Sequence, residues 1–109
     1  MDENEFRSKS EEALTSLQRA LERASDQYDF EVDSNAGALS IEFEDPPAKF
    51  VVSPNAPVRQ IWVSARVQSF KLDWNAAAGA FVLPDGRTLH LLIAAVVGEQ
   101  LGEAVTLTG

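Results

Sequence analysis

Three periodic patterns follow one another along this chain, and their order is the feature that most constrains its fold. Apolar residues recur at helical spacing near the N-terminus, then alternate with polar residues through several short segments, and return to helical spacing near the C-terminus. Consecutive strands with short turns between them pair as antiparallel hairpins. The order therefore predicts an α+β sandwich with an antiparallel sheet.

The two helical segments have clear apolar stripes. The first spans about residues 3–24, and its apolar positions are Phe6, Ala13, Leu14, Leu17, Leu21 and Ala24. The second spans about residues 89–101, with Thr88 as its expected N-cap. Its buried stripe is Leu89, Leu92, Ile93 and Val96. Each stripe is expected to face the core.

Six segments have strand character, at about residues 28–33, 39–43, 50–52, 58–65, 68–74 and 80–83. The breaks between them include Asn35-Ala36-Gly37, Pro46-Pro47, the loop over residues 53–57 and Pro84-Asp85-Gly86. A chain of 109 residues without an internal repeat or linker can form one hydrophobic core. We therefore expect a single domain over residues 1–109.

Composition excludes several classes of protein. The chain has no cysteine, so a disulfide framework, a thiolate-held metal cluster and a cysteine nucleophile are excluded. No apolar run approaches the roughly 18 residues that a membrane span needs. The N-terminal sequence is acidic and lacks the apolar stretch of a secretory signal. The expected compartment is a bacterial-type cytoplasm.

Charge is very unevenly distributed along the sequence. Residues 1–45 contain 13 Asp and Glu against 4 Lys and Arg, whereas residues 46–109 contain 4 against 5. The first helix and the strands after it should therefore form an acidic face on a nearly neutral body. Such a face attracts cations and basic protein surfaces, and repels nucleic acid and anionic lipid.

Five carboxylates around the end of the first helix form the candidate metal site: Glu22, Asp26, Asp29, Glu31 and Asp33. The first two are four residues apart and share a helix face, and the other three project from one side of a strand. Oxygen ligands suit hard cations, which relieve the repulsion between clustered carboxylates. Because no EF-hand spacing is present, such a site is shallow and weak. The alternative is a solvated acidic face that only maintains solubility.

Trp62 has the wrong phase for a core residue. Ile61 and Val63 point to one side of their strand, so Trp62 shares the other side with Gln60 and Ser64. An exposed Trp among polar neighbours is typical of the anchor of a protein interface. The alternative is that a loop or a chain end covers the ring.

His90 is the only histidine, at the start of the second helix. A hydrolase that uses His90 with nearby carboxylates is one function to consider. However, nothing in the sequence marks a serine as activated. Glycine-rich phosphate loops and HExxH zinc motifs are also absent from the sequence. We therefore do not expect an enzyme.

Several short sequences along the chain belong together as a set. The main one is the strand Pro57-Val58-Arg59-Gln60-Ile61-Trp62-Val63-Ser64. The others are Glu5-Phe6, Gly37-Ala38-Leu39-Ser40-Ile41, Asp73-Trp74, Asp85-Gly86 and Leu89-His90-Leu91-Leu92. The set resembles the frataxin family, including its bacterial CyaY-type members, whose corresponding strand has the pattern P-x-x-Q-[IV]-W-[LV]-[SA]. The resemblance covers nearly the whole chain.

The resemblance implies a two-layer α/β sandwich with both helices on one face of the sheet. It also implies weak surface binding of iron, as Fe(II) or Fe(III), and work in iron–sulfur cluster assembly. Family members bind the cysteine desulfurase and its complex with the scaffold protein, and modulate sulfur delivery. No nucleic acid or membrane partner is expected, and without metal the protein is expected to be a monomer.

The family's functional positions carry over to particular residues of this chain. Acidic-ridge positions fall on Glu22, Asp29, Glu31 and Asp33, with Asp26 beside them, and the scaffold-facing positions fall on Gln60 and Trp62. Gln18, Arg19, Arg23 and Ser25 stand where bacterial relatives often have acids, so this ridge is thinner. The alternative function is a purely protein-binding acidic module, which uses the ridge as a docking surface for a basic patch and binds metal only incidentally.

Overall fold

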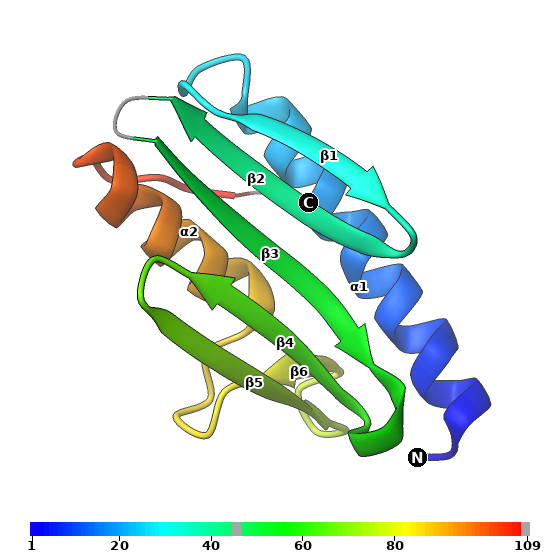
Figure 1. Cartoon of the computed structure of the whole chain (residues 1–109). Helices are drawn as coiled ribbons and strands as arrows, with labels where there is room; N and C mark the ends of the chain where they lie inside the picture. The colour runs from blue at the N-terminus through cyan, green and yellow to red at the C-terminus, as the bar shows by residue number, and fades with distance from the viewer. Residues whose placement is uncertain (45–46, 108–109) are drawn as a thin grey trace.

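The computed structural model describes residues 1–44 and 47–107. Its helices are α1 (Glu3–Ala24), the short 3-10 helix η1 (Ala56–Val58) and α2 (Leu89–Leu101). Its strands are β1 (Glu31–Asn35), β2 (Ala38–Glu44), β3 (Pro47–Asn55), β4 (Gln60–Ala65), β5 (Gln68–Asn75) and β6 (Ala80–Val82). They form one six-stranded sheet in chain order, and every neighbouring pair is antiparallel. Figure 1 shows α1 and α2 on the same side of this sheet, which confirms the predicted fold.

The core fills the space between the two helices and the sheet. Ile41 pairs with Phe50 across β2 and β3, and Ile61 pairs with Leu72 across β4 and β5; all four side chains are fully buried. The buried apolar residues of the helices are Phe6, Leu14, Leu17, Ala20, Leu21 and Ala24 in α1, and Leu89, Leu92, Ile93, Val96 and Val97 in α2. The predicted stripes are confirmed, except that Ala13 is only half-buried.

Both long helices begin at residues whose side chains satisfy free backbone N–H groups. The Asp2 carboxylate accepts a hydrogen bond from the N–H of Glu5 at 2.8 Å. At α2 the Thr88 hydroxyl accepts from the N–H of Leu91 at 3.3 Å, which confirms Thr88 as the N-cap. Neither helix, within the described part of the chain, is long and apolar enough to cross a membrane.

The first strand begins later than its alternation predicts. The sequence predicts a strand over residues 28–33, whereas β1 spans Glu31–Asn35. The N–H of Tyr28 donates to the carbonyl of Ala24 at 2.9 Å, and the N–H of Phe30 donates to the carbonyl of Tyr28 at 3.1 Å. The backbone N–H groups of residues 28 and 30 are therefore used in the turn that follows α1, and not in the sheet. As a result, Asp29 precedes the strand that it was expected to belong to.

The third strand is longer than predicted, because the expected loop over residues 53–57 contains part of it. β3 pairs with β2 only as far as Val52, so residue 54 needs no backbone hydrogen bond to β2. Pro54, which has no N–H to donate, is therefore tolerated there and pairs with Ile61 of β4. Pro47 is the first residue of β3, and Pro46, the other half of the predicted break, lies outside the described residues. β4 begins at Gln60, two residues late, because residues 56–58 form η1.

Candidate functional site

The sheet face opposite the helices carries most of the candidate residues, and it faces the viewer in Figure 1. Because strand residues alternate, every second residue of each strand points outwards on this face. Cross-strand pairing arranges these residues in three successive rows: Glu31, Glu42 and Lys49; Asp33, Ser40, Val51, Ser64 and Ser69; and Ser53, Trp62 and Lys71. A band of mostly small side chains therefore lies between a charged group and Trp62.

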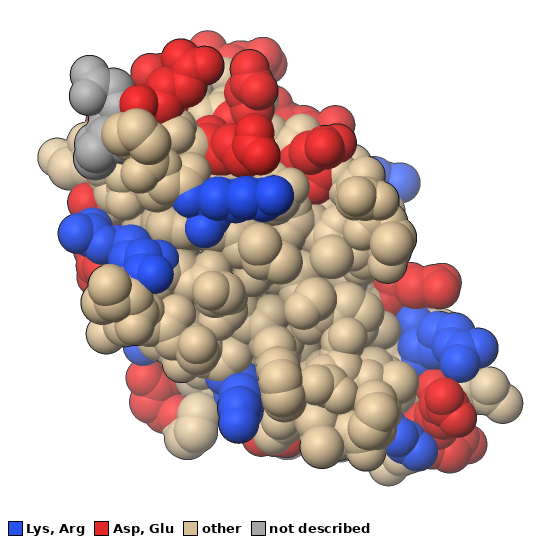
Figure 2. Space-filling model, in the orientation of Figure 1, with Lys and Arg blue, Asp and Glu red and all other residues tan. Residues whose placement is uncertain are grey.

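Five acidic residues lie at the charged end of this face, and we call them the acidic corner: Asp29, Glu31, Asp33, Glu42 and Glu44. All five residues are exposed. Figure 2 shows acidic side chains gathered at this end of the sheet, over β1 and β2. Sequence reasoning missed Glu42 and Glu44 as site residues. Their alternation with the buried residues of β2 is the signal that could have found them.

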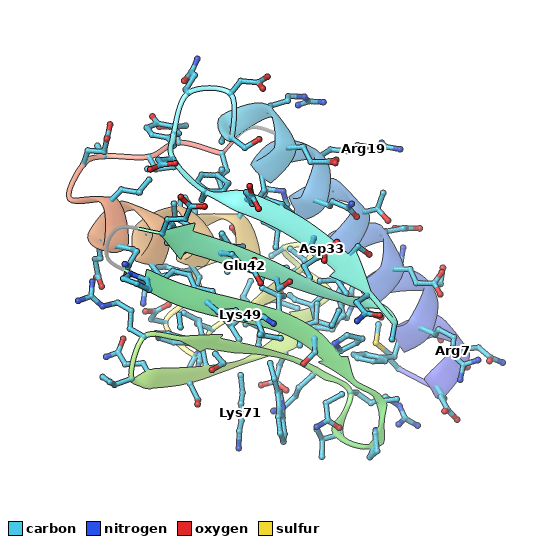
Figure 3. The ribbon with its side chains drawn as sticks, turned by 45° about the horizontal axis from the view of Figure 1, so that its top comes forward. Arg7, Arg19, Asp33, Glu42, Lys49 and Lys71 are labelled. Carbon is cyan, nitrogen blue, oxygen red and sulfur yellow. The ribbon has the colours of Figure 1, made fainter. Side chains whose placement is uncertain are left out.

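Two carboxylates of the acidic corner face each other directly. Glu31 of β1 is the cross-strand partner of Glu42 of β2, and Glu42 is the partner of Lys49 of β3. The Lys49 ammonium lies 3.9 Å from a Glu42 carboxylate oxygen, and both side chains are more than half exposed. Figure 3 shows Asp33, Glu42 and Lys49 in succession on this face. Lys49 therefore offsets part of the repulsion, but in high-dielectric surroundings that keep the ion pair weak.

The other two predicted ligands come from the helix layer. Glu22 lies near the end of α1 and Asp26 lies in the turn that follows, and both are exposed. Glu22, Asp29 and Glu31 line one shallow hollow of about 670 Å³. Asp26 is not among the residues that line it. The structure thus brings Glu22 towards the acidic corner and leaves Asp26 outside the hollow.

The donor chemistry of these residues suits a hard cation, but their geometry does not form a cage. Within residues 1–44 and 47–107, no three Asp, Glu or His side chains converge closely enough to hold a metal ion together. Carboxylates on a solvated surface can therefore supply one or two ligands, and water has to supply the others. The arrangement favours a loosely held cation that exchanges readily over a resident metal.

Trp62 lies on the open face, as the alternation predicts. Its side chain is 37% exposed, whereas Ile61 and Val63 on either side are buried. Lys71, its cross-strand partner on β5, places its ammonium 4.9 Å from the centre of the indole ring, within the range of a cation–π interaction. Lys71 projects away from the sheet in Figure 3. A large exposed ring beside small residues has the features of an interface anchor.

Gln60 and Asp73 are connected to this ring by hydrogen bonds. The indole Nε1–H of Trp62 donates to Oε1 of Gln60 at 3.0 Å, and Nε2 of Gln60 donates to Oδ1 of Asp73 at 3.1 Å. Gln60 was predicted as a site residue, whereas Asp73 was not. Finding Asp73 requires the β4–β5 register, in which it lies directly opposite Gln60.

His90 is half-buried where the two helices meet. Its Nε2 lies 3.3 Å from the hydroxyl oxygen of Ser16 on α1. Burial lowers the pKa of His90 below its ordinary value, and the contact with Ser16 acts in the opposite direction. Within the described residues no carboxylate hydrogen-bonds to His90, so the arrangement of acid, histidine and serine that a hydrolase needs is not formed there.

Comparison with known proteins decides the family. A sequence model of the frataxin-like domain matches residues 1–103. This chain belongs to the frataxin-like family. The iron–sulfur cluster assembly protein CyaY of Dechloromonas aromatica is 33% identical over 107 residues, which cover 98% of this chain and 99% of that protein. CyaY of Azotobacter vinelandii is 35% identical over 95 residues, which cover 84% of this chain and 86% of that protein.

The fold of a solved frataxin agrees with this assignment. Frataxin from Psychromonas ingrahamii matches the structure with a TM-score of 0.84 over the full length of both chains, at 22% sequence identity. Membership of the frataxin-like family also confirms the expectation that this chain is not an enzyme, and it removes the hydrolase interpretation of His90.

Proposed function

We propose that this frataxin-like protein is an iron-binding regulator or iron donor in iron–sulfur cluster assembly in the bacterial cytoplasm. It acts by binding the complex of the cysteine desulfurase with the scaffold protein, as a monomer when no metal is present. The observation that carries the proposal is the match of an iron–sulfur cluster assembly protein over 98% of the chain. The open sheet face supplies surfaces suited to both parts of this role.

Iron in this proposal is a cargo that the protein holds briefly. The acidic corner and Glu22 supply carboxylate oxygens, which suit Fe(III) and, less strongly, Fe(II). Asp26 is exposed beside this region and adds to the negative potential. Because no closed set of ligands surrounds the ion, release to a partner requires only the exchange of a few exposed carboxylates for the partner's ligands.

The two parts of the open face suit different partner surfaces. The acidic corner is complementary to a basic patch, which we assign to the desulfurase. Trp62 with Gln60 presents a large ring on a nearly neutral surface, which we assign to the scaffold. In the sheet order, Trp62 on β4 is three strands from Glu31 and Asp33 on β1 and two strands from Glu42 on β2, or about 10–15 Å across the sheet at the usual spacing between strands. One assembled complex of ordinary interface size can therefore cover both.

A purely protein-binding module is the alternative function. The lack of three convergent ligands among the described residues favours this alternative, because docking to a basic surface needs only negative potential. A pull-down with purified desulfurase and scaffold, with Fe(II) and with a chelator, distinguishes the two. Capture of the complex that increases with Fe(II) supports iron-linked regulation. Equal capture under both conditions supports the docking module, and no capture under either condition contradicts both.

A further inference from the structure

We propose that Asp73 is a positioning residue: through the Gln60 amide it holds the Trp62 indole in one orientation before any partner arrives. This inference rests on the proposed role of Trp62 as a partner anchor. The atoms that carry it form a continuous chain, from the indole Nε1 to Gln60 at 3.0 Å and from Gln60 to Asp73 at 3.1 Å.

The chemistry of the Trp62 indole and of the Asp73 carboxylate fixes the direction of the two hydrogen bonds. An indole N–H can only donate a hydrogen bond, and an ionised carboxylate can only accept one. The residue between them must therefore accept on one side and donate on the other. The Gln60 side chain does both, with its oxygen towards Trp62 and its nitrogen towards Asp73. Glutamate in its place would present an acceptor to the acceptor of Asp73.

The surroundings of the ring explain why such a restraint matters. The residue opposite Trp62 on β3 is Ser53, which is too small to pack against the whole indole. A hollow of about 220 Å³ beside the ring is lined in part by Val51, Ser64 and Ser69. A released ring has room to turn into that hollow and cover it. The Lys71 ammonium lies over one face of the ring, and the hydrogen bond from Nε1 to Gln60 restrains its edge.

Two consequences follow for the partner. The indole N–H is already satisfied within the protein, so the partner needs to supply apolar contact to the ring rather than an acceptor for Nε1. Ordering a flexible side chain on binding usually weakens affinity, and a ring that is already ordered avoids this loss. Loss of these two hydrogen bonds should therefore weaken partner binding roughly 2- to 12-fold without removing any atom of Trp62.

The test follows the indole ¹⁵N–¹H signal of Trp62 in the free, full-length protein, with Trp62→Phe used to distinguish it from Trp74. In the wild type, ¹⁵N relaxation should give this group an order parameter close to that of rigid backbone, about 0.85. Asp73→Ala should lower it towards about 0.6 or less. Asp73→Asn keeps a carbonyl oxygen as acceptor and should restore the order although the charge is lost. Gln60→Met removes both hydrogen bonds at similar length and should act like Asp73→Ala.

Binding to the desulfurase–scaffold complex is then titrated with the same variants. The proposal expects weaker binding by Asp73→Ala and Gln60→Met, and near wild-type binding by Asp73→Asn. An unchanged order parameter in both disruptive variants overturns the positioning role, whatever the binding result. A loosened ring with unchanged affinity also overturns it. Absence of binding by the wild type contradicts the proposed function instead, while the relaxation data on the free protein still test the positioning of the ring.

Discussion

Glu31 and Glu42 face each other directly across β1 and β2, so the exposed sheet face carries a like-charged cross-strand pair. Opposite charges at such positions stabilise a sheet and like charges destabilise it, by about 0.2–1 kcal/mol. Lys49 relieves only part of this repulsion, at 3.9 Å from Glu42. Because both carboxylates are exposed, they are available to a cation or a basic partner surface.

Replacing Glu31 by Lys should therefore stabilise the fold and weaken desulfurase binding. The change converts a repulsive pair into an attractive one, so we expect about 0.5–1 kcal/mol of added stability in denaturant unfolding. Asp33→Lys is the matched control, because Asp33 lies opposite Ser40 and has no facing carboxylate. Asp29→Lys should give an intermediate gain through general repulsion. Loss of stability in Glu31→Lys would show that this carboxylate makes structural bonds.

Metal should bind weakly and at the acidic corner. Addition of Fe(II), or of a diamagnetic hard cation for comparison, should broaden or shift backbone amide signals over residues 18–35 and around Glu42. Salt or divalent cations should also raise the melting temperature, by screening the repulsion or by binding the native state. Perturbation centred on Trp62 or His90 would place the metal elsewhere and contradict this assignment.

Gly98→Ala should destabilise the protein, although alanine is the better helix former. A Cβ atom at residue 98 of α2 would lie 2.8 Å from the backbone oxygen of Glu103, where the chain turns back over the helix. We expect a loss of about 1–3 kcal/mol, the usual range for overpacking. Ala95→Gly at an exposed position of α2 measures helix propensity alone and should cost about 1 kcal/mol. A gain in stability for Gly98→Ala would mean that the chain end moves aside freely.

The burial of His90 should make stability fall as the solution is acidified. Its folded-state pKa is lowered below the ordinary value near 6.5, so the unfolded chain takes up a proton first as the pH falls. The contribution of neutral His90 is complete above about pH 6.5 and is lost as the pH drops through the folded-state pKa. Melting temperatures between pH 7.5 and 5 should fall more steeply for the wild type than for His90→Gln. Parallel curves would show that His90 does not contribute.

Local patterns predicted much of the open face correctly, because burial on one side of a strand determines what lies on the other. Ile61 and Val63 are buried in the core, so Trp62 has to point outwards. The same argument applied to β2 would have placed Glu42 in the acidic corner. The N-cap at Thr88 also depends only on its own turn, and it was predicted correctly.

Features that depend on distant parts of the chain were not predicted. The hydroxyl of Tyr28 donates to the carbonyl of Ala104 at 3.4 Å, and this contact joins two turns that no local pattern connects. It lies beside the point where the predicted start of the first strand is wrong. Asp73 likewise gains its role only when the β4–β5 hairpin places it opposite Gln60. The predicted strands end at residue 65 and begin again at residue 68, as β4 and β5 do. Because Arg66-Val67 is not a pair typical of a tight turn, no local signal selects which residues of the two strands face each other.

The most direct test of the account combines thermal unfolding and binding measurements on Trp62→Ala. An exposed ring contributes little to folding, so unfolding should stay within about 0.5 kcal/mol of the wild type. Loss of an interface anchor typically costs about 2 kcal/mol or more of binding, so affinity for the desulfurase–scaffold complex should fall at least tenfold. A normal melting temperature with tenfold weaker binding is the predicted result. A sharply lowered melting temperature with unchanged binding by the folded fraction would contradict the claim that this sheet face is the docking surface.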